Sequence, residues 1–333
     1  MKICVVGAGA IGGYLAVRLA MAGHEVSVVI RGPNLAAVKA HGLKLITGDK
    51  EEVAPVTATA HIADLPPQDL VILGMKAHQV AAVAPQLGTL LHDDTLIVTA
   101  QNGVPWWYFM KHGGDFEGSR IEAVDPGGEV SSHIDYHRVI GTIVYPACEM
   151  DAPGVIRHVE GNRFSLGELD GADTPRIRTV ADAFRKAGLK APITADIRAE
   201  IWLKLWGNVT FNPISALTHA TLVDICEFPA TRELAVQMMG EAKAVGEKLG
   251  VPFKVSLEQR LAGAAAVGKH KTSMLQDVEI GRQLELGALV AAVIDLGRIT
   301  GVPTPSIHNV YALASLLAKT LKDETGRLCI AKA

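Results

Sequence analysis

The sequence predicts an α/β, Rossmann-type dinucleotide-binding domain followed by an all-α domain, over residues 1–195 and 196–333. In the first part, short apolar runs alternate with helical stretches, a pattern typical of a parallel sheet covered on both faces. In the second part, stretches rich in Ala, Leu and Glu indicate helices. The cleft between two such domains is where we expect a small-molecule substrate to bind.

The first strand and the turn after it indicate a phosphate-binding site. Residues 2–6 read as a buried strand, followed directly by Gly7, Ala8, Gly9, Ala10, Ile11 and Gly12. A helical stretch and a second strand, 24–30, complete the context that a dinucleotide site needs, which disfavours an unrelated glycine-rich turn. Gly7 permits the tight turn, Gly9 lets the backbone approach a pyrophosphate, and Gly12 lets the helix pack on the sheet. The helix N-terminus would then hold the phosphates.

The end of the second strand indicates which cofactor binds. An NAD site usually carries Asp or Glu about 20 residues after the glycine turn, to bind the ribose 2′-hydroxyl. Here Arg31 follows the strand, and the next acidic residue is Asp49. An acid would repel a 2′-phosphate, whereas Arg can pair with it through two N–H donors. The sequence therefore favours NADP(H), with a solvated loop arginine as the alternative.

The rest of the first domain contains further strands and helices in alternation. We expect strands at 69–75, 95–100, 139–145, 155–159, 163–166 and 190–194, and helices at 79–91 and 174–187. A segment rich in Gly, Asp, Ser and His, 111–138, is predicted to be a loop or short helix inserted before the strand at 139. Lys76 and Asn102 each follow a predicted strand, at the sheet edge where ligands bind.

A polar stripe lies on the first predicted helix of the second domain, for which Asp196 is the expected N-cap. Lys204, Asn208 and Asn212 recur every four residues between tryptophans and other apolar residues. Partial desolvation would lower the pKa of Lys204 and make it a better proton donor. Pro213 is predicted to end the helix and to aim the Asn212 amide into the cleft. From the pattern alone, a solvated stripe on an amphipathic helix is the favoured alternative.

A second polar cluster spans residues 272–279. Ser273 and Gln276 have the spacing of a capping box, which alone would explain Ser273. Glu285 comes eight residues after Asp277 and would share its face on a helix over 274–300, with an exposed helix carboxylate as the alternative. Small residues in that helix permit close packing within a core or across a dimer.

Composition excludes several classes of partner. The 333 residues carry a net charge of −3, with no basic field to bind nucleic acid. Four widely spaced cysteines without a C-x-x-C pair argue against structural zinc and indicate reduced thiols in a cytosol. The uncharged stretch at 3–17 is interrupted by glycines and is too short to span a bilayer. We therefore expect a cytoplasmic protein with no metal and no membrane partner.

Together these motifs resemble the ketopantoate reductase (2-dehydropantoate 2-reductase) family over nearly the whole chain. The resemblance rests on the glycine turn, Lys76, Asn102-Gly103, the run from Arg198 to Pro213, and Ser273–Asp277 with Glu285. It implies an NADP-dependent oxidoreductase of pantothenate biosynthesis that acts on CH–OH groups. Such an enzyme reduces a 2-oxo acid to a 2-hydroxy acid. The leading substrate that the resemblance implies is ketopantoate, which would be reduced to pantoate. A homodimer is implied weakly.

The resemblance also implies a role for each site residue. The catalytic pair would be Lys204, the general acid, and Glu285, which would bond the nicotinamide ribose and help close the cleft. Substrate would be bound by Asn102, Asn208, Asn212 and Ser273. Cofactor would be bound by the glycine turn, Arg31, Lys76, Asn102, Ala147 and Glu285. Asp277 would help to hold the geometry of the site.

Three departures from the family pattern concern the substrate. The loop 217–222 lacks an Asn that the family usually has there, His270 stands where an Asn is usual, and the 111–138 segment is longer than in the simplest members. The alternatives are a relative that reduces a different 2-oxo acid or an imine, and a non-catalytic NADP(H)-binding sensor. Lys204 argues against the sensor, because cofactor binding alone does not need an ammonium group.

Overall fold

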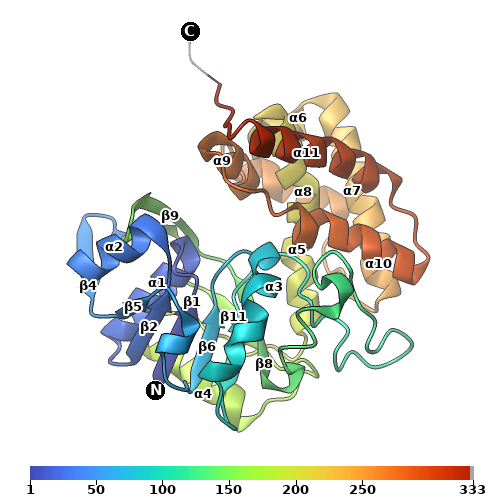
Figure 1. Ribbon diagram of the computed structural model, residues 1–333. Coiled ribbons are helices and arrows are strands. Elements are labelled where there is room, and N and C mark those ends of the chain that lie inside the picture. The colour runs from blue at the N-terminus through green and yellow to red at the C-terminus, as the bar shows by residue number, and fades with distance from the viewer. Residues whose placement is uncertain (331–333) are drawn as a thin grey trace. The chain divides into compact units, whose positions relative to one another are not determined.

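The computed structural model describes residues 1–330, which form two compact units (Figure 1). The first unit comprises Met1–Arg120 and Asp125–Ile197, and the second comprises Ile121–Val124 and the chain from Arg198 onward. The sheets belong to the first unit, and the second is made of helices and their connections. The predicted fold class is therefore confirmed.

The main sheet of residues 1–330 has seven strands in the order β11-β8-β7-β6-β1-β2-β5. Neighbours from β5 to β8 are parallel, and β11 is antiparallel to β8. The strands are β1 Lys2–Val6, β2 Glu25–Val29, β5 Thr57–Thr59, β6 Leu70–Leu73, β7 Leu96–Thr99, β8 Val139–Val144 and β11 Phe164–Gly167. Strand order reverses beside β1, and open α/β sheets bind ligands at such a reversal, outside the carboxyl ends of the strands.

The helices of this unit are α1 Ala10–Met21, α2 Gly32–His41, α3 Val80–Val83 and α4 Pro175–Lys186. The helix predicted over 79–91 is instead α3 followed by a 3₁₀ helix, Ala84–Leu90, because Pro85 cannot continue the α-helical hydrogen bonds. The strand predicted at 190–194 is also wrong. It forms only isolated bridges at Lys190 and Ile193, since Pro192 between them has no N–H to donate.

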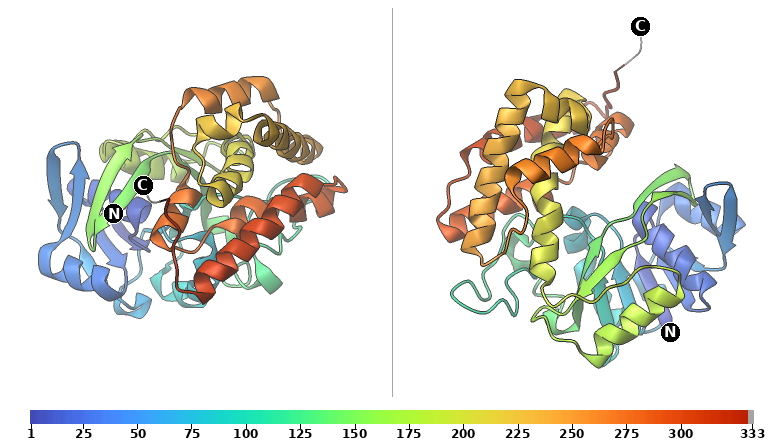
Figure 2. Two further views of the ribbon diagram at one scale, coloured as in Figure 1. Left: turned by 90° about the horizontal axis from the view of Figure 1, so that it is seen from above. Right: turned by 180° about the vertical axis from the view of Figure 1, so that it is seen from behind.

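A second sheet in the first unit was not predicted. Within residues 1–330 it has four strands in the order β4-β3-β10-β9, and they are β3 Leu43–Thr47, β4 Lys50–Ala54, β9 Ala147–Ala152 and β10 Val155–Glu160. Figure 2 shows its green strands beside the blue segment that carries β3 and β4. Helix α1 packs closely on this sheet. A methyl group on Gly13 of the helix would lie only 2.7 Å from Cδ1 of Ile156 in β10.

The helical unit is built around α5, Ile197–Thr218. The other helices are α6 Leu222–Glu227, α7 Pro229–Lys248, α8 Leu257–Ala266, α9 Ser273–Ile280, a π-helix Gly287–Ala291, α10 Ala292–Thr300 and α11 Pro305–Asp323. Trp202 and Trp206 of α5 are fully buried, and both meet the ring of Phe253 edge-on. The indole N–H of Trp206 donates to the carbonyl of Met239 at 2.8 Å, which joins α5 to α7.

Two predicted helix boundaries are wrong. Helix α5 continues through Pro213 to Thr218, and the neighbouring Phe211 and Ile214 are buried. Burial of such apolar side chains in the core outweighs the loss of one backbone N–H. The helix predicted over 274–300 ends instead at Gly281, which adopts a left-handed C-cap conformation with φ of +70°.

The 111–138 segment is irregular, as predicted, with 3₁₀ turns at Pro126–Gly128 and Tyr136–Arg138. Its central residues, Ile121–Val124, belong to the helical unit although the chain on both sides belongs to the first unit. The N–H of Ala123 donates to the carboxylate of Asp295 on α10 at 2.8 Å. This hydrogen bond ties the inserted segment to the helical unit.

Candidate functional site

The glycine turn has the geometry that the sequence predicted. Gly7 has φ of +91°, and its N–H donates to the carbonyl of Val29 at 3.0 Å. A methyl group on Gly12 would lie 2.1 Å from the carbonyl oxygen of Gly7, so only glycine fits there. Gly9 caps α1 without a side chain, and no atom lies within 4 Å of the place its Cβ would occupy. The first N–H groups of α1 therefore face a space that a phosphate could fill.

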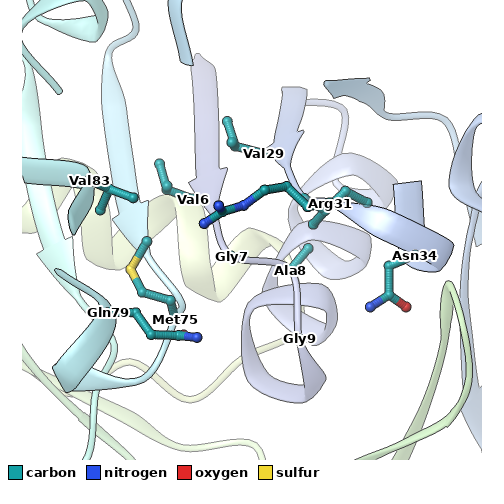
Figure 3. Close-up of a pocket in the computed structure, with 11 residues that line it drawn as sticks. Val6, Gly7, Ala8, Gly9, Val29, Arg31, Asn34, Met75, Gln79 and Val83 are labelled. Atoms are coloured by element: carbon teal, nitrogen blue, oxygen red, sulfur yellow. The ribbon is translucent and has the colours of Figure 1, made fainter. Parts of the chain in front are cut away.

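A cavity of about 210 Å³ lies at the carboxyl ends of β1, β2 and β6. Figure 3 shows side chains that line it. The lining residues are Val6, Gly7, Ala8, Gly9, Val29, Ile30, Arg31, Asn34, Met75, Gln79 and Val83. The lining includes one charged residue, Arg31, and no acidic residue. The structure thus brings the glycine turn and Arg31 together around one cavity.

Arg31 occupies the N-cap position of α2, where its backbone is extended and its side chain makes no capping hydrogen bond. Its side chain reaches across the cavity on the side of Val6 and Gly7 (Figure 3). Asn34, Met75 and Gln79 also line the cavity and were missed by sequence reasoning. The signal that could have indicated Asn34 is a polar residue one turn after Arg31, shortly after the second strand.

Lys76 and Asn102 follow β6 and β7, which are neighbours in the sheet. Both side chains are half-buried, and the Lys76 N–H donates to Oε1 of Gln79 at 3.2 Å. The Gln101 amide donates to the carbonyl of Leu73 at 2.9 Å, which ties the ends of the two strands together. Ala147 is the half-buried first residue of β9, in the second sheet.

The stripe of Lys204, Asn208 and Asn212 lies on one face of α5, because that helix is unbroken through Pro213. Lys204 and Asn208 are half-buried and Asn212 is buried. Burial lowers the pKa of Lys204 to about 8, although the carboxylate of Glu285 acts in the opposite direction. The structure therefore pairs these two residues electrostatically, and the amine can gain or lose a proton close to neutral pH.

The second polar cluster differs from the prediction. The hydroxyl of Thr272, not that of Ser273, caps α9 and accepts the Leu275 N–H at 3.2 Å. Ser273 is the exposed first residue of the helix, so capping does not explain it. Asp277 is buried within α9, whereas Glu285 is half-buried in the stretch between Gly281 and the π-helix. These two carboxylates therefore do not share a helix face.

Within residues 1–330, no group of three or more His, Cys, Asp or Glu side chains could hold a metal ion. No helix in the same range is long and apolar enough to cross a membrane. The four cysteines, which all lie in the described part of the chain, are unpaired.

Comparison with known proteins places the whole chain beside one group of enzymes. The model "Ketopantoate reductase PanE/ApbA" matches residues 3–171, and the model of the C-terminal part of the same family matches 196–318. The chain is 55% identical to a 2-dehydropantoate 2-reductase from Mesorhizobium japonicum, over 96% of this chain and 98% of that protein. A crystal structure from Ralstonia solanacearum MolK2 matches with a TM-score of 0.92 and 43% identity, over 96% of this chain and 98% of the other.

Proposed function

The chain belongs to the ketopantoate reductase family of NADPH-dependent oxidoreductases, and from this premise we propose how its residues reduce 2-dehydropantoate to pantoate. One observation carries the assignment of roles. Lys204 is a half-buried amine whose pKa is lowered to about 8, and it interacts with the carboxylate of Glu285. An amine in that state suits proton transfer at neutral pH better than a solvated lysine does.

Proton transfer is the task that we assign to Lys204. When bound, NADPH would supply a hydride to C2 of the 2-oxo acid. Negative charge then develops on the carbonyl oxygen, and the Lys204 ammonium group stabilises that oxygen and donates its proton. Solvent returns a proton to the amine after the hydroxy acid leaves. Asn208 and Asn212 are placed one and two turns further along α5, where their amides can orient the oxygens of the substrate.

Substrate and cofactor contacts divide between the two parts of the chain. We assign most cofactor contacts to residues 1–195 and most substrate contacts to residues 196–333, with Ser273 bonding the substrate near its carboxylate. The N–H groups of Gly9, Ala10, Ile11 and Gly12 would hold the pyrophosphate, and Arg31 would pair with the 2′-phosphate. Lys76, Asn102, the backbone of Ala147 and Glu285 complete the proposed cofactor contacts, and Asn102 would also touch the substrate.

A panel of 2-oxo acids tests the substrate assignment, with NADPH consumption followed by its absorbance. We expect 2-dehydropantoate to give the highest kcat/KM of the panel. A higher value for another 2-oxo acid, or for an imine, would make this chain a relative with a different substrate. Binding of NADPH without turnover of any compound would favour the sensor.

We also propose a homodimer, for which helix α11 offers an apolar surface. Leu313 and Leu316 lie one turn apart on that helix and are 60% and 62% exposed. Light scattering should give twice the monomer mass. Leu313→Lys should lower the measured mass, whereas Lys319→Ala on the same helix should not.

A cytoplasmic location is proposed from the unpaired cysteines, because oxidising compartments favour disulfides. Cell fractionation tests it.

A further inference from the structure

Asn34 is a polar residue of the cofactor cavity for which the mechanism above has no role. It lies in the first turn of α2, three residues after Arg31, and its half-buried side chain lines the same cavity as the glycine turn. In Figure 3 its amide lies across the glycine turn from Met75 and Gln79. Its position therefore places it among the groups that would meet the adenosine end of a dinucleotide.

The orientation of the Asn34 amide is set by Gly154. The N–H of Gly154, at the turn between β9 and β10, donates to Oδ1 of Asn34 at 3.1 Å. The carbonyl of Gly154 in turn accepts the N–H of Lys44 at 2.9 Å, so both backbone groups of this buried glycine are engaged. A methyl group on Gly154 would lie 3.2 Å from the side chain of Val38, which shows how closely the turn packs on α2.

A fixed amide oxygen leaves the amide nitrogen as the group that Asn34 can offer to a ligand. An Asn side chain has one acceptor oxygen and a nitrogen with two donor hydrogens, so binding the oxygen to Gly154 turns the donors to the other side. Figure 3 shows that nitrogen on the side of Ala8 and Gly9, with the oxygen on the opposite side. The cavity is therefore lined by a guanidinium and an oriented N–H donor, with no carboxylate in its lining.

This set of donors favours NADPH, which carries a 2′-phosphate, over NADH, which carries a 2′-hydroxyl. A 2′-phosphate is an acceptor with up to two negative charges, and it gains from every N–H placed around it. A ribose 2′-hydroxyl is best held by a carboxylate that accepts its hydrogen, which the lining lacks. We propose that Asn34 is a second specificity-determining residue, which donates from Nδ2 to the adenosine 2′-phosphate of NADPH while Gly154 holds its orientation. This inference rests on the proposed cofactor.

The substitution Asn34→Asp tests the proposal with little change in shape. Aspartate keeps an oxygen for the Gly154 N–H but replaces the donor with a negative charge. We expect the ratio of kcat/KM with NADPH to kcat/KM with NADH to fall by about tenfold or more. The matched control is Asn309→Asp, an exposed position on α11, which should leave the ratio unchanged. Thermal unfolding of both variants shows whether each is folded.

A binding measurement separates this inference from the proposed function. Adenosine 2′,5′-bisphosphate and 5′-AMP differ only in the 2′-phosphate, and calorimetry gives the affinity of each. We expect the native chain to bind the bisphosphate more tightly, and Asn34→Asp to remove most of that advantage. If the native chain shows no advantage, the proposed cofactor preference itself fails. If the native advantage is present and Asn34→Asp retains it along with the NADPH:NADH ratio, only the role of Asn34 is overturned.

Discussion

Gly12 and Gly7 are in such close contact that a single methyl group on Gly12 would sit 2.1 Å from the carbonyl oxygen of Gly7. The atom in the way is backbone and cannot rotate aside. Gly12→Ala should therefore push α1 away from β1 and lower the free energy of unfolding by about 1–3 kcal/mol. Chemical denaturation measures the loss. The control is Gly88→Ala, where no atom lies within 4 Å of the added methyl group and stability should change little.

Unlike Gly12→Ala, Gly9→Ala should weaken cofactor binding and leave stability unchanged. The Cβ of an alanine would meet no protein atom within 4 Å, and the backbone φ of −73° suits any residue. The variant should keep the native unfolding midpoint but bind NADPH about tenfold or more weakly, because the methyl group occupies the space proposed for the pyrophosphate. Fluorescence titration of NADPH gives the affinity. Unchanged binding would remove the glycine turn from the cofactor site.

Lys204→Ala should lower kcat by about 10²–10⁴-fold while NADPH affinity changes little. The reason is that the proposed proton donor acts at the substrate oxygen and not on the cofactor. Steady-state kinetics and NADPH titration separate the two quantities. Lys319→Ala, an exposed lysine of α11, is the control. A Lys204→Ala enzyme with native kcat would exclude Lys204 from the chemistry.

The pH profile should report the pKa of Lys204, which is about 8. Reduction needs the ammonium form, so kcat/KM should be constant at lower pH and fall about tenfold for each pH unit above that value. Oxidation of the hydroxy acid needs the neutral amine and should instead rise to a plateau above the same pH. Because the Glu285 carboxylate raises this pKa, Glu285→Gln should move both limbs to lower pH. A limb that stays in place would show that another group titrates.

Arg31→Ala should relax the preference for NADPH over NADH. The guanidinium supplies the positive charge in the cavity lining, and its charge-assisted hydrogen bonds to a phosphate are worth about tenfold to a hundredfold in affinity. The ratio of kcat/KM values with the two cofactors measures the change. Arg298→Ala, on α10 of the helical unit, provides a comparison. A native ratio in Arg31→Ala would make Arg31 a surface residue only.

The parts of the fold that sequence predicted are those with a strong local signal. The apolar runs of β1, β6 and β7 and the glycine turn were assigned correctly because buried parallel strands are apolar on both faces. The strand predicted at 155–159 is confirmed as β10, but the second sheet was missed because its other strands, β3, β4 and β9, carry mixed polarity. Strand β4, Lys50–Ala54, is largely exposed, and β3 pairs in parallel with β10 from more than a hundred residues away. Pairing between strands so far apart in the chain gives no signal in the sequence near either strand.

Errors at the site have the same origin. Pro213 is a strong local signal for a helix end, yet the apolar residues around it keep α5 intact and place Asn212 in line with Lys204. Spacing alone put Asp277 and Glu285 on one helix, but Gly281 ends that helix between them. The amide of Asn34 is oriented by the N–H of Gly154, which lies 120 residues later in the chain. Its orientation could not be predicted from neighbouring residues.

Because Ile121–Val124 belong to the helical unit, the backbone passes between the two units three times within the described residues, after Arg120, Val124 and Ile197. A recombinant fragment that starts at Arg198 would lack the Ala123 N–H that the carboxylate of Asp295 accepts. Neither half of this protein is thus encoded by one continuous stretch of its gene. Exchanging halves with a relative requires that the four-residue piece be transplanted together with the helices it serves.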